Sequence, residues 1–152
     1  PNTPAAIGRG VTGAAASAGV SGAQRALAQK LLSAVGSVEW VADESLIDAG
    51  TAVSGSGPAY VFLLAECLAQ AGAAAGLPPD LAARLARAPV EGAGGLMHRS
   101  PETTPAQLRI NVTSPGGTTE AALRVLMADD GLKPLMERAV AAADARAKAL
   151  SG

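Results

Sequence analysis

The sequence predicts a mainly helical fold that is preceded by a short β-α-β segment. Hydrophobic residues make up 49% of the 152 residues, but aromatic residues only 2%. The core must therefore be built from Ala, Leu and Val, which suits closely packed helices better than stacked sheets. After Asp43 the apolar residues follow a helical spacing almost to the end of the chain.

Residues 1–42 are expected to be the tail of an α/β domain. Residues 11–16 predict a short strand, and residues 21–24 have the spacing of a capping box that begins a helix running to about Ala34. A brief strand is expected around residues 38–41. These elements are too few to complete a sheet, so they are interpreted as a remnant of a larger domain.

Residues 43–152 are expected to form a separate helical domain. Helices are predicted over residues 44–53, 58–76, 80–99, 105–113, 119–128 and 132–150. Gly55–Pro58 is expected to break the first of these helices from the second. Pro89 is expected to kink the third helix, because an interior proline removes a backbone hydrogen bond.

The helix predicted over residues 58–76 carries only Glu66 and Gln70 as polar residues. A helix that is apolar on nearly every face must be surrounded by protein. A domain this small can hardly enclose it alone, which predicts an intimate homo-oligomer. Its apolar stretch, residues 58–68, is judged too short to cross a membrane.

Charge and cysteine content exclude several classes of function. The net charge is −1, from 12 basic and 13 acidic residues without a basic stripe, so neither nucleic acid nor a membrane surface is expected as a partner. The single Cys67 excludes an internal disulfide, and with His98 as the only histidine no metal site is expected. No signal peptide is recognised, and a cytoplasmic location is expected.

The strongest local pattern is the turn Ser114-Pro115-Gly116-Gly117-Thr118-Thr119, which a helix follows at once. Glycines let a backbone fold tightly, and the first amides of a helix converge with its dipole on one spot. This pattern suits a carboxylate or a phosphate, although Glu120 argues against a highly charged phosphate. The alternative is an ordinary turn in which Thr118 merely caps its helix.

Other candidate residues are interpreted as structural. Ser54–Pro58 lacks the third glycine and the preceding strand of a dinucleotide fingerprint, and is equally explained by tight helix contact. Cys67 is expected to pack inside its helix, and His98 to cap a helix end. Glu66 and Gln70 are expected to hydrogen-bond across a helix interface.

Together, residues 51–60 (TAVSGSGPAY) and 111–119 (NVTSPGGTT) resemble the pyrroline-5-carboxylate reductase family, whose members catalyse the last step of proline biosynthesis. The resemblance covers essentially the whole chain, with the family's segments in the same order. It implies that residues 1–42 are the tail of an NAD(P)-binding Rossmann domain. Residues 43–152 would be the helical dimerisation and substrate-binding domain, a helical bundle forming an interlocked homodimer. Larger ring assemblies stay open.

The resemblance also implies an activity: hydride transfer from NADPH, or NADH, to the C=N bond of Δ1-pyrroline-5-carboxylate, an imino acid, to give L-proline. The catalytic residue it implies is Thr119, whose hydroxyl would lie near the ring nitrogen. The substrate-binding residues it implies are Ser114, Gly117, Thr118 and Thr119. The cofactor-binding residues it implies are Asn2, Thr3, Pro4 and Asn111. No metal is implied.

Three departures qualify the resemblance. The family's glycine-rich cofactor turn is missing, so this piece of the enzyme is expected neither to bind cofactor tightly nor to turn over alone. Pro89 falls where a family helix is uninterrupted, and Gly50 replaces a larger apolar residue.

Two alternatives remain from the sequence. One is a non-catalytic helical dimerisation module, and the other is the helical half of another NADPH-dependent imine reductase or hydroxyacid dehydrogenase. The dehydrogenases typically rely on a helix lysine, but Lys30, Lys133 and Lys148 lie in no site-like motif.

Overall fold

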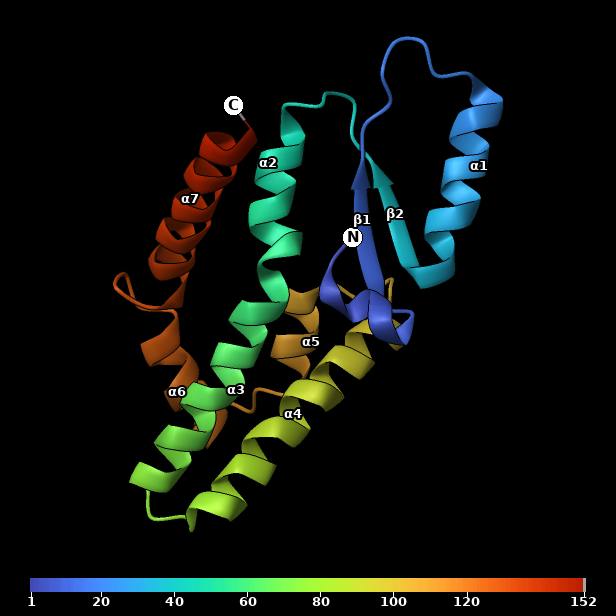
Figure 1. Ribbon diagram of the computed structural model, residues 1–152. Helices are drawn as coiled ribbons and strands as arrows, with labels where there is room; N and C mark the ends of the chain where they lie inside the picture. The colour runs from blue at the N-terminus through green and yellow to red at the C-terminus, as the bar shows by residue number, and fades with distance from the viewer. Residues whose placement is uncertain (152) are drawn as a thin grey trace. The chain divides into compact units, whose positions relative to one another are not determined.

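The computed structural model describes residues 1–151, which fall into two compact units (Figure 1). Unit 1 holds Pro1–Tyr60 and the last part of the chain from Glu137, and unit 2 holds Val61–Met136. Most described residues are helical, and the strands form one two-stranded sheet, which confirms the predicted mainly α fold with a short β-α-β segment. The predicted domain boundary after residue 42 lies inside unit 1 and stays a prediction.

The β-α-β segment of unit 1 begins with the 3-10 helix η1 (Thr3–Ile7) and continues through β1 (Gly10–Ala14), α1 (Gly22–Leu32), η2 (Ser33–Val35) and β2 (Gly36–Trp40). The strands are parallel, and their register runs from Gly10 opposite Gly36 to Ala14 opposite Trp40. The predicted capping box is confirmed, because Ser21 and Gln24 bond each other's backbone amides.

Gly36 lets the second strand start beside the first. Its φ is +150°, and a Cβ placed there would lie 1.9 Å from the Gly10 carbonyl oxygen. Only glycine fits this position, because any side chain would collide with the neighbouring backbone. At the other end of the strand pair, the Trp40 indole donates a hydrogen bond of 2.6 Å to Gln29 and lies under the Arg25 guanidinium, which ties α1 to β2.

Only a short bend interrupts the helical run where a break was predicted. α2 (Leu46–Gly50) passes into a π-helical turn, η3 (Thr51–Gly55), and then into α3 (Gly57–Ala74). Ser56 is a bend between the π-helical turn and α3, and α3 begins at Gly57, so the helix start predicted beside Pro58 is confirmed. The helical run nevertheless keeps one course from Leu46 to Ala74. The helical run Leu46–Ala74 is long and apolar enough to cross a membrane by length and composition alone, so the length estimate from residues 58–68 was too short. One such helix is weak support for a membrane span.

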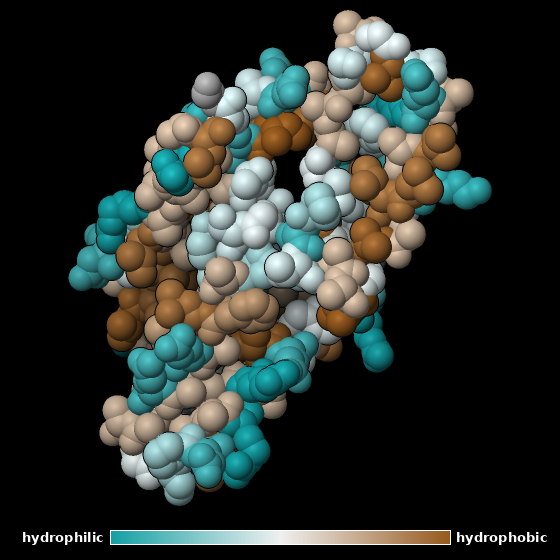
Figure 2. All heavy atoms as spheres, in the orientation of Figure 1, coloured by the Kyte–Doolittle hydropathy of each residue, from teal (hydrophilic) through white to brown (hydrophobic). Residues whose placement is uncertain are grey.

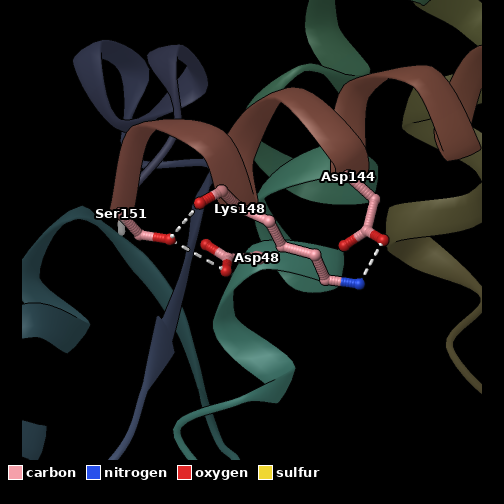
Figure 3. Close-up of polar contacts among 4 residues, drawn as sticks. All are labelled: Asp48, Asp144, Lys148 and Ser151. Carbon is pink, nitrogen blue, oxygen red and sulfur yellow. Dashed lines mark hydrogen bonds and ion pairs between the residues drawn. The ribbon is translucent and has the colours of Figure 1, made fainter.

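The last turns of α7 (Leu132–Ser151) lie against α2 within unit 1 (Figure 3). The Ser151 hydroxyl lies 3.1 Å from Asp48 Oδ2 and 3.3 Å from the Lys148 carbonyl oxygen. Lys148 Nζ contacts Asp144 Oδ2 at 2.6 Å, and this hydrogen bond raises the pKa of the lysine above its ordinary value. These contacts join the end of the chain to the helix that follows the strands.

Unit 2 contains α3 from Val61 onward, α4 (Pro79–Arg99), α5 (Pro105–Asn111) and α6 (Thr118–Leu126). α4 continues through Pro89 as one helix. Thr104 caps α5 by accepting a hydrogen bond of 3.2 Å from the Gln107 amide, whereas the Gln107 side chain bonds Asn111, so the 104–107 capping box is only half formed. α3 and α4 diverge in Figure 1, and the groove between them has apolar walls lined by Phe62, Ala65 and Val90.

The described residues bury very little. Their fully buried hydrophobic side chains are Ala52, Ala82 and Ala86, and their buried polar residue is Thr12. Large apolar side chains instead reach the surface, among them Leu31 on α1, Phe62 on α3 and Val125 on α6, with exposed fractions of 65%, 68% and 72%. Apolar side chains are visible along α1 and around α6 in Figure 2. Such surfaces mark sites of association with other protein.

Candidate functional site

The predicted anion-binding turn connects α5 to α6 in unit 2. Gly116 takes φ = +71°, in the left-handed region that favours glycine. Gly117 donates its amide hydrogen to the Ser114 carbonyl at 3.0 Å, and a Cβ on Gly117 would come equally close to that oxygen. Glycine is therefore favoured at position 116 by the backbone conformation and at position 117 by the close Ser114 carbonyl, as the sequence predicted.

The start of α6 leaves backbone amides open. The residue that caps the helix is Gly117, which has no side chain to accept a hydrogen bond, and Thr118 is the first helical residue. The alternative in which Thr118 caps its helix is therefore wrong. Because the first amides of a helix have no partner inside it, those of Thr118 and Thr119 are free to receive a ligand. The side chains of Ser114, Thr118 and Thr119 are exposed beside them.

Glu120 has a place in this turn that the sequence did not predict. Its Oε2 accepts a hydrogen bond of 2.8 Å from the Gly116 amide and lies 3.8 Å from the Arg124 guanidinium. The carboxylate thus holds the turn from inside the helix that follows it. An acidic residue in the first helical turn was the available signal, but its contact with Gly116 depends on the left-handed turn conformation.

A pocket of about 480 Å³ opens beside the turn, with mostly apolar walls and two arginines. It is lined by Arg109, Ile110, Thr113, Glu120, Leu123, Arg124 and Met127. Asn111, the predicted cofactor residue of unit 2, accepts a hydrogen bond of 2.8 Å from Gln107 Nε2 on its own helix. Its proposed contact with cofactor stays a prediction.

The predicted cofactor residues Asn2, Thr3 and Pro4 belong to unit 1, where Asn2 has a structural role. Its Oδ1 accepts a hydrogen bond of 3.0 Å from the Val11 amide, and its Nδ2 donates one of 2.9 Å to the Ser54 carbonyl. In a regular helix that carbonyl would pair with residue 58, but Pro58 has no amide hydrogen. Asn2 replaces the missing donor and so joins β1 to η3.

The π-helical turn has a second such compensation. The Ser56 amide donates to the Thr51 carbonyl at 3.0 Å and so passes over the Ala52 carbonyl. The Tyr60 hydroxyl donates to that carbonyl at 3.0 Å. Of the two carbonyls left without a helical partner, that of Ala52 is bonded by Tyr60 from the same segment, and that of Ser54 is bonded by Asn2 from the start of the chain.

Unit 1 also has a small pocket, of about 280 Å³, beside this turn. It is lined by Pro1, Val11, Gly13, Val41, Leu46, Ile47, Gly50, Thr51, Ser54 and Gly55. Thr3 is exposed and Pro4 is half-buried in η1.

The remaining candidates form no site. The Cys67 thiol is free and exposed, not packed as expected. Gln70 donates a long hydrogen bond of 3.4 Å to Glu66 along α3 itself and not across a helix interface. His98 lies in the last turn of α4. Among residues 1–151 no cluster of His, Cys, Asp or Glu could hold a metal ion.

The structure shows a mainly helical chain whose first part is a strand-helix-strand segment. Residues 44–150 match the family described as pyrroline-5-carboxylate reductase dimerisation. The chain is 49% identical to a pyrroline-5-carboxylate reductase of Pseudomonas aeruginosa over 151 residues, which cover 99% of this chain and 55% of that protein. It is 42% identical to one of Pisum sativum, with coverage of 99% and 54%.

Solved structures agree with this assignment. A pyrroline-5-carboxylate reductase of Coxiella burnetii superposes with a TM-score of 0.91 at 43% identity, covering 99% of this chain and 55% of that one. The Plasmodium falciparum reductase, solved with NADP bound, gives 0.83 at 31% identity, with coverage of 100% and 61%. The chain belongs to the pyrroline-5-carboxylate reductase family. It spans about half the length of the curated relatives that it matches.

Proposed function

We propose that this chain is the substrate-binding and subunit-assembling part of an enzyme that reduces Δ1-pyrroline-5-carboxylate to L-proline with NADPH or NADH. The observation that carries the proposal is the turn before α6, where the amides of Thr118 and Thr119 stand open at a helix start in a chain of this family. A singly charged carboxylate on a small ring is a suitable ligand for these amides.

The turn orients the substrate for reduction. With the carboxylate on the open amides, the hydroxyls of Ser114 and Thr119 are the nearest side-chain groups of the turn. Thr119 is proposed to accept or donate a hydrogen bond at the ring nitrogen, so that the C=N bond is held in one orientation. Positioning is the appropriate role, because a threonine hydroxyl is too weak an acid to supply a proton alone.

The nicotinamide cofactor supplies the hydride that adds to the carbon of the C=N bond, while the nitrogen gains a proton. Toward that cofactor this chain offers Thr3, Pro4 and Asn111. Asn2 uses both polar ends of its amide within the protein, so it can act there only by fixing the loop of residues 1–4. The glycine-rich turn that would hold the pyrophosphate is not among these residues.

A homodimer is proposed to cover α3, which is apolar around most of its circumference. The family match over residues 44–150 is to a dimerisation domain, and Val61, Phe62 and Leu63 on successive positions are 46%, 68% and 57% exposed. Burial against a second copy of the chain would remove these side chains from water, so a membrane is not needed to explain their exposure. A cytoplasmic location, without nucleic-acid or membrane partners, belongs to the same proposal.

The test is a fusion protein in which the part of the P. aeruginosa reductase that this chain does not cover precedes Pro1. NADPH oxidation is followed with pyrroline-5-carboxylate as substrate. We expect turnover, and expect Thr119→Ala to lower kcat/KM by about 10- to 100-fold through lost orientation. The matched control is Thr103→Ala, which removes the same groups from the loop before α5 and should leave the rate unchanged.

A folded, dimeric fusion protein without turnover would contradict the enzymatic proposal and favour the non-catalytic dimerisation module. If Thr119→Ala turned over at the wild-type rate, the role proposed for the Thr119 hydroxyl would be contradicted, but the enzymatic proposal would stand.

A further inference from the structure

The side chain of Asn2 is used in an unusual way for a residue that begins a helix. Asn2 is the capping residue of η1, and an asparagine in that place ordinarily accepts a hydrogen bond from one of the first helical amides. Here the side chain makes no such bond. Its Oδ1 accepts from the Val11 amide at 3.0 Å, and its Nδ2 donates to the Ser54 carbonyl at 2.9 Å. The side chain therefore joins β1 to η3 and leaves its own helix uncapped.

The backbone of Asn2 holds η1 at the same time. Its carbonyl oxygen accepts a hydrogen bond of 3.1 Å from the Ala5 amide, and the Pro4 carbonyl accepts one of 3.0 Å from the Arg9 amide. Thr3 lies between these two fixed points, and its side chain is exposed. The hydrogen bonds of Asn2 thus fix the backbone on which Thr3 and Pro4 are carried, while the Thr3 hydroxyl stays at the surface.

The neighbouring groups of η3 do not replace the donor that Asn2 supplies. Pro58 has no amide hydrogen to offer the Ser54 carbonyl. The Ser54 hydroxyl is itself donated to the Gly50 carbonyl at 2.8 Å. Because a partly buried carbonyl that loses its donor is costly, the bond from Asn2 holds the start of the chain against η3.

We propose that Asn2 is a positioning residue for the nicotinamide cofactor, which holds the loop of residues 1–4 ready for binding by fastening it to η3. The proposal rests on the function proposed above, which assigns Thr3 and Pro4 to the cofactor. A loop that is fixed beforehand loses little conformational freedom when a ligand binds, whereas a loose loop must be ordered at that moment. Ordering the backbone of about one residue weakens binding by about tenfold.

The test compares cofactor and substrate kinetics of the fusion protein. Asn2→Asp has nearly the same shape and keeps the acceptor for the Val11 amide, but turns an oxygen in place of a donor toward the Ser54 carbonyl. The KM for NADPH should rise about tenfold because the loop is loosened. The KM for pyrroline-5-carboxylate should stay within about twofold, because that ligand is assigned to the turn before α6.

Tyr60→Phe is the matched control, since it removes the other side-chain donor of the same π-helical turn and leaves the hydrogen bonds of Asn2 in place. Thermal unfolding should show that both variants are less stable than the wild type, while Tyr60→Phe keeps the KM for NADPH. Asn2→Ala, which adds no charge, should raise that KM as Asn2→Asp does, and it serves as the second variant if Asn2→Asp does not fold. An unchanged KM for NADPH in the Asn2 variants, or an equal rise in Tyr60→Phe, would overturn the proposal.

A fusion protein that binds NADPH but does not turn over would count against the proposed function alone. The dissociation constant of NADPH is then measured from the fluorescence of the nucleotide, and it should be about tenfold higher in Asn2→Asp. Hydrogen exchange of the Ala5 amide, followed by NMR on the 152-residue chain, tests the loop without any cofactor. It should be faster in Asn2→Asp and unchanged in Tyr60→Phe, and equal exchange in Asn2→Asp and the wild type would show that Asn2 does not fix the loop.

Discussion

At the scale of single residues, the molecule relies on side chains that complete backbone hydrogen bonding. The Asn2 side chain hydrogen-bonds the Val11 amide and the Ser54 carbonyl. The Tyr60 hydroxyl donates to the Ala52 carbonyl, which the shifted hydrogen bonding of the π-helical turn leaves free. Buried polar backbone left without a partner is costly, so these side chains stabilise the helix more than their modest contact areas suggest.

Asn2→Ala should lower the free energy of unfolding by about 1–3 kcal/mol, because it removes a donor and an acceptor from partly buried backbone groups. Urea unfolding followed by circular dichroism measures the loss. Asn111→Ala is the matched control, since its amide makes an exposed bond within α5, and should change stability by less than about 0.5 kcal/mol. Equal losses in both variants would contradict the role given to Asn2.

Asp43 gives a prediction on pH. Its Oδ1 accepts a hydrogen bond of 2.8 Å from the Ser45 amide, and this bond lowers the pKa of the carboxyl below 3.8. A lowered pKa in the folded state stabilises the protein above pH 3.8 and loses that stabilisation as the pH falls. NMR titration should give a midpoint below that value, and Ser45→Pro, which removes the amide hydrogen, should restore the ordinary one.

Residue roles were only partly predictable from the sequence. The capping box at residues 21–24 and the glycines of the turn could be found because each acts within a few residues of itself. Asn2 bonding Ser54 could not, because the pairing spans 52 positions and depends on where the strand meets the helix. The Glu120 contact was local but required the left-handed conformation of Gly116.

At the scale of elements, the parallel strand pair depends on one glycine. Gly36→Ala should destabilise unit 1 by more than about 2 kcal/mol, because the new Cβ meets the Gly10 carbonyl and φ is unfavourable. Gly92→Ala on α4, where a Cβ meets no neighbour within 4 Å, should instead stabilise by about 0.5–1 kcal/mol. Thermal unfolding of both variants provides the comparison, and two changes of the same sign would contradict it.

Element boundaries were predicted well where a cap or a turn marks them, and poorly around the π-helical turn. Two glycines followed by a proline usually end a helix, which made Gly55–Pro58 look like a break. A new helix does begin at Gly57, but the π-helical turn before it could not be predicted, because the carbonyls freed there are satisfied by the side chains of Asn2 and Tyr60. The spacing of apolar residues along the sequence does not reveal side-chain hydrogen-bond donors such as the Asn2 amide and the Tyr60 hydroxyl.

At the scale of the whole molecule, the exposed area is large for the mass of the chain. The chain of 14.9 kDa exposes 10794 Å². Even two separate compact units of half that mass would expose only about 8,500 Å² together. The difference, about 2,300 Å² per chain, is in the range that obligate subunits bury against one another, which supports the proposed homodimer.

Light scattering without detergent should therefore give a mass of at least twice 14.9 kDa. Phe62→Glu should shift the chain toward monomer, because it places a charge on the apolar surface of α3. Leu31→Glu on α1, at a side chain that is 65% exposed, is the control and should leave the mass unchanged. A monomeric wild-type chain would refute the dimer, and a Phe62→Glu dimer would place the interface elsewhere.

The hydrogen bond from Asn2 to the Ser54 carbonyl also couples two positions of the chain that lie far apart in sequence. Asparagine at position 2 compensates for proline at position 58, so the two positions are not free to drift independently. A chain with an ordinary residue at position 58 has its own amide for that carbonyl and can lose asparagine at position 2 at less cost. The start of the strand segment and the start of α3 are therefore expected to have been inherited as a pair.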